Sequence, residues 1–308
     1  MLILLIVLLN LYSACGDMQT EIKLHERSVR VKDTVSLRAG VTDIVNDSVK
    51  FNYNSTVKKL KKTLGRNFVI KTYSCFVVAS NLEVKETQKI IDHTIAEAEK
   101  CFYNDYFEKK PDEIVTIYLF KDEKSYRTWA KKLFGDDDVS SFGYYKPSKR
   151  AMLMNIATGG GTLVHELTHA FVRYDFPDIP VWFNEGLGSL YERCSMKNKI
   201  ITGLVNWRLP SVQKAIKNRV YTGLGHLINT GGEEFYGENS GFYYAQARYF
   251  CMYLQEKGLL KTFYKKFRDG YEDDKTGEIF ITEVLNKSVA EIDREFAQWV
   301  WQLKYDDN

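Results

Sequence analysis

The residues best suited to chemistry stand together in residues 162–169, which read Thr-Leu-Val-His-Glu-Leu-Thr-His. In a helix, His165 and His169 lie one turn apart on the same face, where both imidazoles can reach one metal ion. Glu166 lies one position further round, so its carboxylate can contact a water molecule at the metal without being a ligand. The pattern predicts a metal site with an adjacent general base.

A third ligand is needed, because a catalytic zinc ion usually takes three protein ligands and keeps one position for water. The next apolar segment, residues 181–192, carries Glu185 among large apolar side chains. A buried carboxylate is normally paired or bound to a metal, so we expect Glu185 to be the third ligand. Asp175 is the alternative, since some zinc proteases place a ligand six residues after the second histidine. Those enzymes need a glycine midway, where this chain has Val172.

The two segments together resemble a known family. His-Glu-Leu-Thr-His at 165–169, followed by Trp-Phe-Asn-Glu-Gly-Leu at 182–187, resembles the gluzincin zinc metallopeptidases, specifically the bacterial peptidase MA-like domain. The resemblance extends from about Phe68 to about Trp301. It implies Zn²⁺ bound by His165, His169 and Glu185, with Glu166 as general base. It also implies an α+β, zincin-like fold, with a small mixed sheet and helices in the N-terminal lobe and a mostly helical C-terminal lobe.

The resemblance further implies that the C-terminal lobe supplies a tyrosine, because gluzincins commonly use a Tyr or His there to hydrogen-bond the oxyanion. Tyr244, directly before Ala-Gln, is the first candidate and Tyr243 the second. A core tyrosine with a satisfied hydroxyl is the alternative. Asn184 and Glu192 are candidates for contacts to the imidazoles, since ligand histidines usually donate their other N–H. Several gluzincins carry an Asp where this chain has Ser189.

The activity implied is hydrolysis of a peptide or protein substrate. Aminopeptidases of this group read a free amine with a carboxylate in a Gly-x-Met-Glu-Asn segment, whereas residues 151–157 contain no acidic residue. An endopeptidase therefore fits better than an exopeptidase. The alternative from another class is an exported, non-catalytic lipoprotein that binds peptides or cell-wall material on a gluzincin scaffold. Glu166 argues against it, because a binding scaffold needs no base beside the metal.

The N-terminus indicates export. Residues 2–9 are an unbroken apolar run, too short to span a bilayer but of the length of a signal-peptide core. The following Ser-Ala-Cys-Gly resembles a bacterial lipoprotein cleavage box, in which Cys15 is lipidated and anchors the protein to the membrane of the cell envelope. No Lys or Arg precedes the run, and Tyr12 stands where Leu is usual, so a plain secretory signal is the alternative. Residues 1–15 are thus predicted to be a lipoprotein signal peptide.

Composition bounds the remaining organisation. Of 308 residues, 43 are Lys or Arg and 40 are Asp or Glu, so no nucleic-acid partner is indicated. Residues 16–66 are polar and without a motif, and we predict a tether or extension there. Residues 67–305 are predicted to be the peptidase domain, with a sheet lobe and the metal helix at 67–175 and a helical lobe at 176–305. The later cysteines lack CxxC spacing, and either disulfides or free thiols are compatible with them.

Five segments rich in β-branched and aromatic residues are predicted to be strands: residues 68–73, 76–78, 114–120, 142–145 and 151–156. Apolar residues at helical spacing predict helices over residues 86–106 and around residues 126–133. In the gluzincin family, the strand just before the metal helix is an edge that pairs with extended peptide. That strand would be residues 152–156, and an ordinary covered edge is the alternative.

Overall fold

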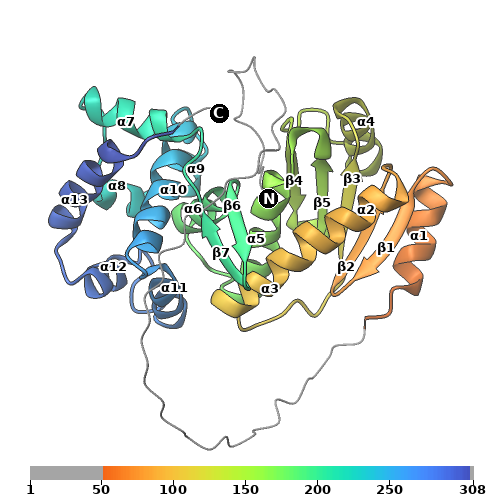
Figure 1. Cartoon of the computed structure of the whole chain (residues 1–308), viewed down its shortest axis with the longest axis horizontal. Helices are drawn as coiled ribbons and strands as arrows, with labels where there is room; N and C mark the ends of the chain where they lie inside the picture. The colour runs from red at the N-terminus through yellow and green to blue at the C-terminus, as the bar shows by residue number, and fades with distance from the viewer. Residues whose placement is uncertain (1–50, 306–308) are drawn as a thin grey trace, which may run out of the picture. The chain divides into compact units, whose positions relative to one another are not determined.

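A five-stranded mixed sheet forms the N-terminal part of the fold (Figure 1). The computed structural model describes residues 51–305, so the predicted signal peptide, Cys15 and residues 16–50 lie outside the described residues. Strands β2, β3 and β5 are parallel, whereas β1 and β4 run antiparallel at the two edges. Their order is β1 (Val69–Tyr73), β2 (Phe76–Ser80), β3 (Val115–Phe120), β5 (Ala151–Asn155) and β4 (Gly143–Lys146). All five predicted strands are present, each within two residues of its predicted bounds.

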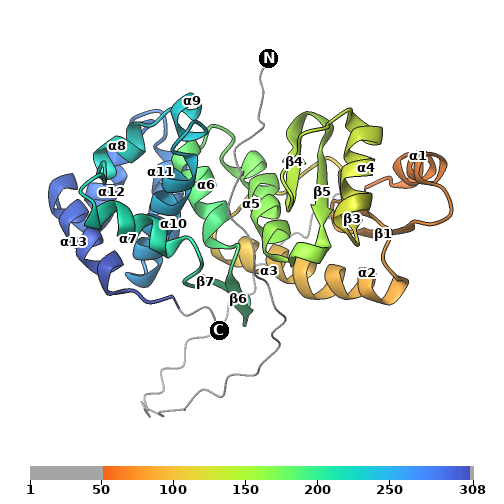
Figure 2. The same ribbon diagram turned by 90° about the horizontal axis from the view of Figure 1, so that it is seen from above.

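Helices cover both faces of this sheet (Figure 2). On one face, α1 (Asn54–Leu64) and α4 (Glu123–Phe134) pack through Leu60, Leu64, Tyr126 and Ala130. The other face is covered by a longer series: α2 (Val84–Ile90), a π-helical turn (Ile91–Ile95), α3 (Ala96–Asp105) and α5 (Gly161–Asp175). Because α1 contacts β1 and β2, the folded unit begins before the boundary predicted at residue 67.

The strand before the His165 helix is not an edge strand, so that prediction was wrong. β5 lies between β3 and β4, and all five of its residues are buried. The chain reverses through a 3₁₀ turn (Pro147–Lys149), and β4 pairs with β5 from Gly143 opposite Met154 to Lys146 opposite Ala151. An uninterrupted apolar strand suits the interior of a sheet, whereas β4 alternates buried and half-buried residues. The edge strand next to β5 is therefore β4.

The C-terminal part is mostly helical, as predicted, and the fold is α+β. Its central helix, α10 (Ser240–Glu256), packs against α6, α7, α11 and α13. A short antiparallel hairpin of β6 (Cys194–Lys197) and β7 (Ile200–Gly203) was not predicted. The helices are α6 (Val181–Leu190), α7 (Leu209–Lys217), α8 (Leu224–Asn229), α9 (Gly232–Phe235), α10, α11 (Leu260–Asp269), α12 (Glu278–Leu285) and α13 (Val289–Gln302). Within residues 51–305, none of the helices has the length and apolar character needed to cross a membrane.

The cysteines of residues 51–305 are free thiols and form no disulfide there: Cys75, Cys101, Cys194 and Cys251. Burial raises the pKa of Cys75 and of Cys194 to about 12. Both thiols are therefore protonated at neutral pH and unreactive as nucleophiles. Of the two alternatives that the sequence leaves open, free thiols hold for this part of the chain.

Close packing of α6 on α10 depends on Gly186. A Cβ atom at this position would lie 2.9 Å from Cys251 Sγ and 3.0 Å from the Ala247 carbonyl oxygen. The backbones of the two helices approach closely because no side chain stands between them. Glu185, the neighbouring residue, is placed by this contact.

We expect Gly186→Ala to lower the free energy of unfolding by about 1–3 kcal/mol, because the added methyl group overpacks a tight helix contact. Gly241→Ala is a matched control in α10, since a Cβ atom there meets nothing within 4 Å. The control should be neutral or stabilising by up to about 1 kcal/mol, as expected from helix propensity. Chemical denaturation followed by circular dichroism measures both. Equal stability of the two variants would contradict the packing argument.

Candidate metal centre

Helix α5 presents three polar side chains of its two middle turns to a cleft, while most of its apolar residues pack in the core. His165, Glu166 and His169 line this cleft, which has a volume of about 690 Å³. Its other walls come from β4, from α6 and from α10. The sequence explains the split, since Leu163, Leu167 and Phe171 are completely buried at helical spacing.

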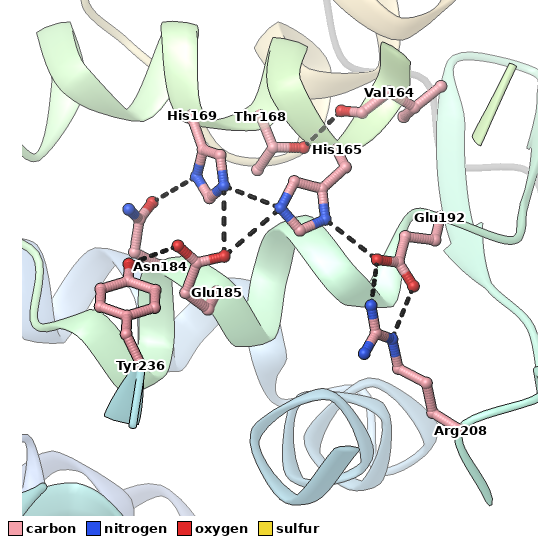
Figure 3. Close-up of polar contacts among 9 residues, drawn as sticks. All are labelled: Val164, His165, Thr168, His169, Asn184, Glu185, Glu192, Arg208 and Tyr236. Carbon is pink, nitrogen blue, oxygen red and sulfur yellow. Dashed lines mark hydrogen bonds and ion pairs between the residues drawn. The ribbon is translucent and has the colours of Figure 1, made fainter. Parts of the chain in front are cut away.

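The part of α5 that carries the two histidines faces α6, and three potential ligands converge there (Figure 3). The Nε2 atoms of His165 and His169 are 2.9 Å apart. Glu185 Oε2 lies 3.3 Å from His165 Nε2 and 3.4 Å from His169 Nε2. The structure thus brings together the three residues predicted to bind metal.

The spacing of these atoms suits a small tetrahedral ion. With bonds of about 2.0–2.1 Å, a tetrahedral zinc ion keeps its ligand atoms about 3.3 Å apart. The three observed separations lie between 2.9 and 3.4 Å. Two nitrogen atoms and one carboxylate oxygen form a common ligand set of catalytic zinc sites. On geometry and donor type, His165, His169 and Glu185 could hold one zinc ion.

Asn184 and Glu192, the two residues that the sequence indicated, contact the imidazole nitrogens that face away from the ligand cluster. Asn184 Oδ1 lies 2.9 Å from His169 Nδ1, and Glu192 Oε1 lies 3.3 Å from His165 Nδ1. Because both partners are acceptors, each imidazole carries a proton on Nδ1. The remaining proton on His165 is held by carboxylates: burial lowers the pKa of His165, but hydrogen bonds to Glu185 and Glu192 raise it overall to about 10. A metal ion would displace that proton, so binding would weaken as the pH falls.

Arg208 fixes Glu192 in turn. Its guanidinium donates to both carboxylate oxygens, at 2.8 Å and 2.7 Å (Figure 3). Burial raises the pKa of Glu192, but the Arg208 charge outweighs it and holds that pKa below the ordinary value. Glu192 lies just past the end of α6 and contacts His165 from there. Ser189, which stands where several gluzincins carry an Asp, does not take this role: its buried hydroxyl makes no hydrogen bond to a described residue. Sequence reasoning missed Arg208, since no motif marks it.

Glu185 has a second partner that the sequence did not reveal. The Tyr236 hydroxyl donates to Glu185 Oε1 at 2.6 Å, leaving Oε2 directed at the two histidines (Figure 3). Tyr236 directly follows the short helix α9, in a loop whose path cannot be read from residue patterns. Burial raises the pKa of Tyr236, and the neighbouring Glu185 carboxylate raises it further. The phenol therefore stays protonated and acts as a donor.

Glu166 stands beside the three ligands without joining them. It is 9% exposed, and burial raises the pKa of its carboxyl. The charges of His165 and His169 and a hydrogen bond from the Tyr145 backbone N–H oppose that shift. A raised carboxyl pKa favours a residue that must both accept and release a proton near neutral pH.

The two candidate tyrosines of α10 face different surroundings. Tyr244 lines the cleft with the metal-site residues, and the Arg208 guanidinium lies 5.2 Å from the centre of its ring. Tyr243 instead donates to Glu234 at 2.6 Å and contacts His226 at 3.0 Å. Tyr244 is therefore the one of the pair placed near the site.

Asp175, the alternative ligand, is engaged elsewhere. It accepts hydrogen bonds from the backbone N–H groups of Glu108 and Lys109, at 2.7 and 2.8 Å. Tyr264 and Arg268 donate to its other oxygen, each at 2.9 Å. Four donors satisfy this buried carboxylate, which ties the end of α5 to α11. Asp175 is a structural residue and not part of the cluster.

Comparison of the chain with models of known protein families finds no match, and comparison with curated proteins finds none either.

We expect Asp175→Asn to lower the free energy of unfolding by roughly 3 kcal/mol at pH 7, because it breaks a buried ion pair. Burial raises the pKa of Asp175, but its four hydrogen bonds bring it below the ordinary 3.8. The ionised form thus stabilises the fold above that value, and this contribution disappears as the pH falls through the native pKa. Denaturation at pH 7 and about pH 3.5 should show the difference from wild type shrinking. A pH-independent difference would contradict the ion-pair account.

Proposed function

We propose that the protein is a zinc-dependent peptidase of the gluzincin type with a zincin-like fold. The observation that supports it most is the convergence of His165, His169 and Glu185 at tetrahedral spacing, with Glu166 beside them in a cleft. A structural zinc site would be closed by four protein ligands, whereas three ligands at a cleft leave room for water and substrate.

The proposed chemistry assigns one task to each group. Zinc, when bound, polarises the scissile carbonyl and lowers the pKa of water. Glu166 accepts the proton of the attacking water and passes it to the leaving amine. Tyr244 is proposed to hydrogen-bond the negative oxygen of the tetrahedral intermediate, since its ring lines the cleft. Tyr236, Asn184 and Glu192 orient the ligands.

The substrate is proposed to be an extended peptide that adds to the edge of β4. This edge strand lies beside α5, and Gly143, Tyr144 and Tyr145 line the cleft. Main-chain hydrogen bonds of an added strand give affinity without regard to sequence. We favour internal cleavage over exopeptidase action because no acidic residue precedes α5 where a free amine would be read. We also propose export and anchoring at the cell envelope through Cys15.

A peptide- or cell-wall-binding lipoprotein that does not cut is the second candidate. It would use the same cleft and the same edge of β4. Glu166 argues against it. Burying a carboxyl beside the ligands costs free energy, and a protein that only binds has no need of a proton-transfer group there.

One zinc ion per chain is the expected stoichiometry, and His165→Ala, His169→Ala or Glu185→Ala should each remove most of it, since two ligands bind zinc weakly. Elemental analysis of the purified proteins measures this. Glu272→Gln, with its exposed side chain, is the control and should retain zinc. Full zinc in Glu185→Ala, together with loss in Asp175→Asn, would contradict the ligand set.

Glu166→Gln separates the enzyme from the binder. It keeps the size and hydrogen-bonding capacity of the side chain but removes the basic carboxylate. We expect unchanged zinc content and a loss of peptide hydrolysis of about a hundredfold to ten-thousandfold. Glu272→Gln, with its exposed side chain, serves as control and should keep full activity. A zinc-loaded wild type that cuts nothing in a broad peptide library, yet binds peptide as well as Glu166→Gln does, would favour the binder.

A further inference from the structure

Arg173 is a cation without an acceptor at the cleft. It lies one turn beyond His169 on α5, is exposed and lines the cleft. Among residues 51–305, no carboxylate lies within ion-pair distance of it, and it makes no hydrogen bond. The other two arginines of the cleft are engaged: Arg127 donates to Glu123 at 2.8 Å, and Arg208 holds Glu192.

Two phenols beside Arg173 also lack partners. The hydroxyls of Tyr145 and Tyr174 are buried and bond to no residue of the described chain. Tyr145 is only 7% exposed, and it lines the cleft from the edge strand β4. Arg173 lowers the pKa of both phenols against the effect of burial, which raises it, so its charge acts on both. Buried hydroxyls normally have a partner, and an acceptor is the group missing here.

We propose that Arg173 and Tyr145 form a subsite that binds a carboxylate of the peptide substrate. This inference rests on the proposed function and adds a substrate class to it. A guanidinium offers a carboxylate two parallel N–H donors, and a phenol offers a third donor. Val172, Phe176 and Pro177 line the same stretch of the cleft and would hold the methylene groups of an acidic side chain.

The spacing gives the position of that carboxylate in the peptide. Arg173 stands one helical turn from His169, a rise of about 5.4 Å along α5. An extended peptide advances about 3.3 Å per residue. The carboxylate therefore belongs to a residue one or two positions from the bond that is cut. It comes either from an Asp or Glu side chain or from the C-terminus of a short peptide.

The experiment uses zinc-loaded full-length protein and libraries of N-acetylated octapeptides, each fixed to Glu or Gln at one position. Amidated and free C-termini form separate arms, which distinguish a side-chain carboxylate from a terminal one. We expect kcat/KM to favour the carboxylate roughly tenfold to a hundredfold at one position, or with a free terminus. Arg173→Ala should abolish that preference while cleavage of the Gln library persists. Tyr145→Phe should reduce it severalfold.

Charge reversal distinguishes recognition from a structural role. Arg173→Glu should prefer Lys over Glu at the same position, whereas a variant that is merely destabilised would lose all substrates alike. Arg66→Ala, an exposed arginine outside the cleft lining, should leave the preference unchanged. Equal cleavage of Glu and Gln peptides by wild type in both arms would overturn the subsite.

The proposed function can fail separately. If wild type cuts neither library, the same peptides labelled with a fluorophore are tested for binding to wild type and Arg173→Ala by anisotropy. Tighter binding of the carboxylate peptide to wild type alone would retain the subsite and reject the peptidase. No difference in binding would reject the subsite as well.

Discussion

The burial of carboxylates at the cleft is the constraint on which the rest of the site depends. Glu166, Glu185 and Glu192 are largely buried around the two histidines. Buried charges must be compensated, because removing them from water costs several kcal/mol each. Arg208, Tyr236 and the two histidines of α5 provide this compensation, and they come from three different stretches of the chain. The fold therefore has to bring these stretches and the segment from Glu185 to Glu192 together before the carboxylates can be tolerated.

Close packing of the helices fixes the positions of the ligand side chains. α6 reaches α10 closely because Gly186 has no side chain, and Gly188 leaves space for the His165 ring, 3.0 Å from where a Cβ atom would lie. Asp175 fixes the end of α5 through four hydrogen bonds, among them two to backbone N–H groups before β3. The ligands thus stand on two helices whose relative position is set by glycine contacts and by one buried carboxylate.

Local patterns predicted what depends on local spacing. The helix carrying His165 and His169, the second helix carrying Glu185 and the five strands all follow from residue periodicity. The pairing partners did not follow: β5 is interior because β4 folds back onto it, and sequence order alone does not reveal the order of strands. Arg208 and Tyr236 were missed for the same reason, since each reaches the site from a loop. The β6–β7 hairpin is too short to show a period.

The charges of the cluster favour a cation among the three ligand atoms. When all three are ionised, Glu166, Glu185 and Glu192 carry three negative charges, and Arg208 supplies one positive charge against them. With both imidazoles neutral, two negative charges remain uncompensated in a buried site. A divalent cation between Glu185 Oε2 and the two Nε2 atoms would neutralise them, whereas protonating both histidines would place two positively charged rings with their Nε2 atoms only 2.9 Å apart, where each charge disfavours the other. The electrostatics and the geometry therefore favour the same occupant, which supports the zinc proposal independently of the His-Glu-x-x-His spacing.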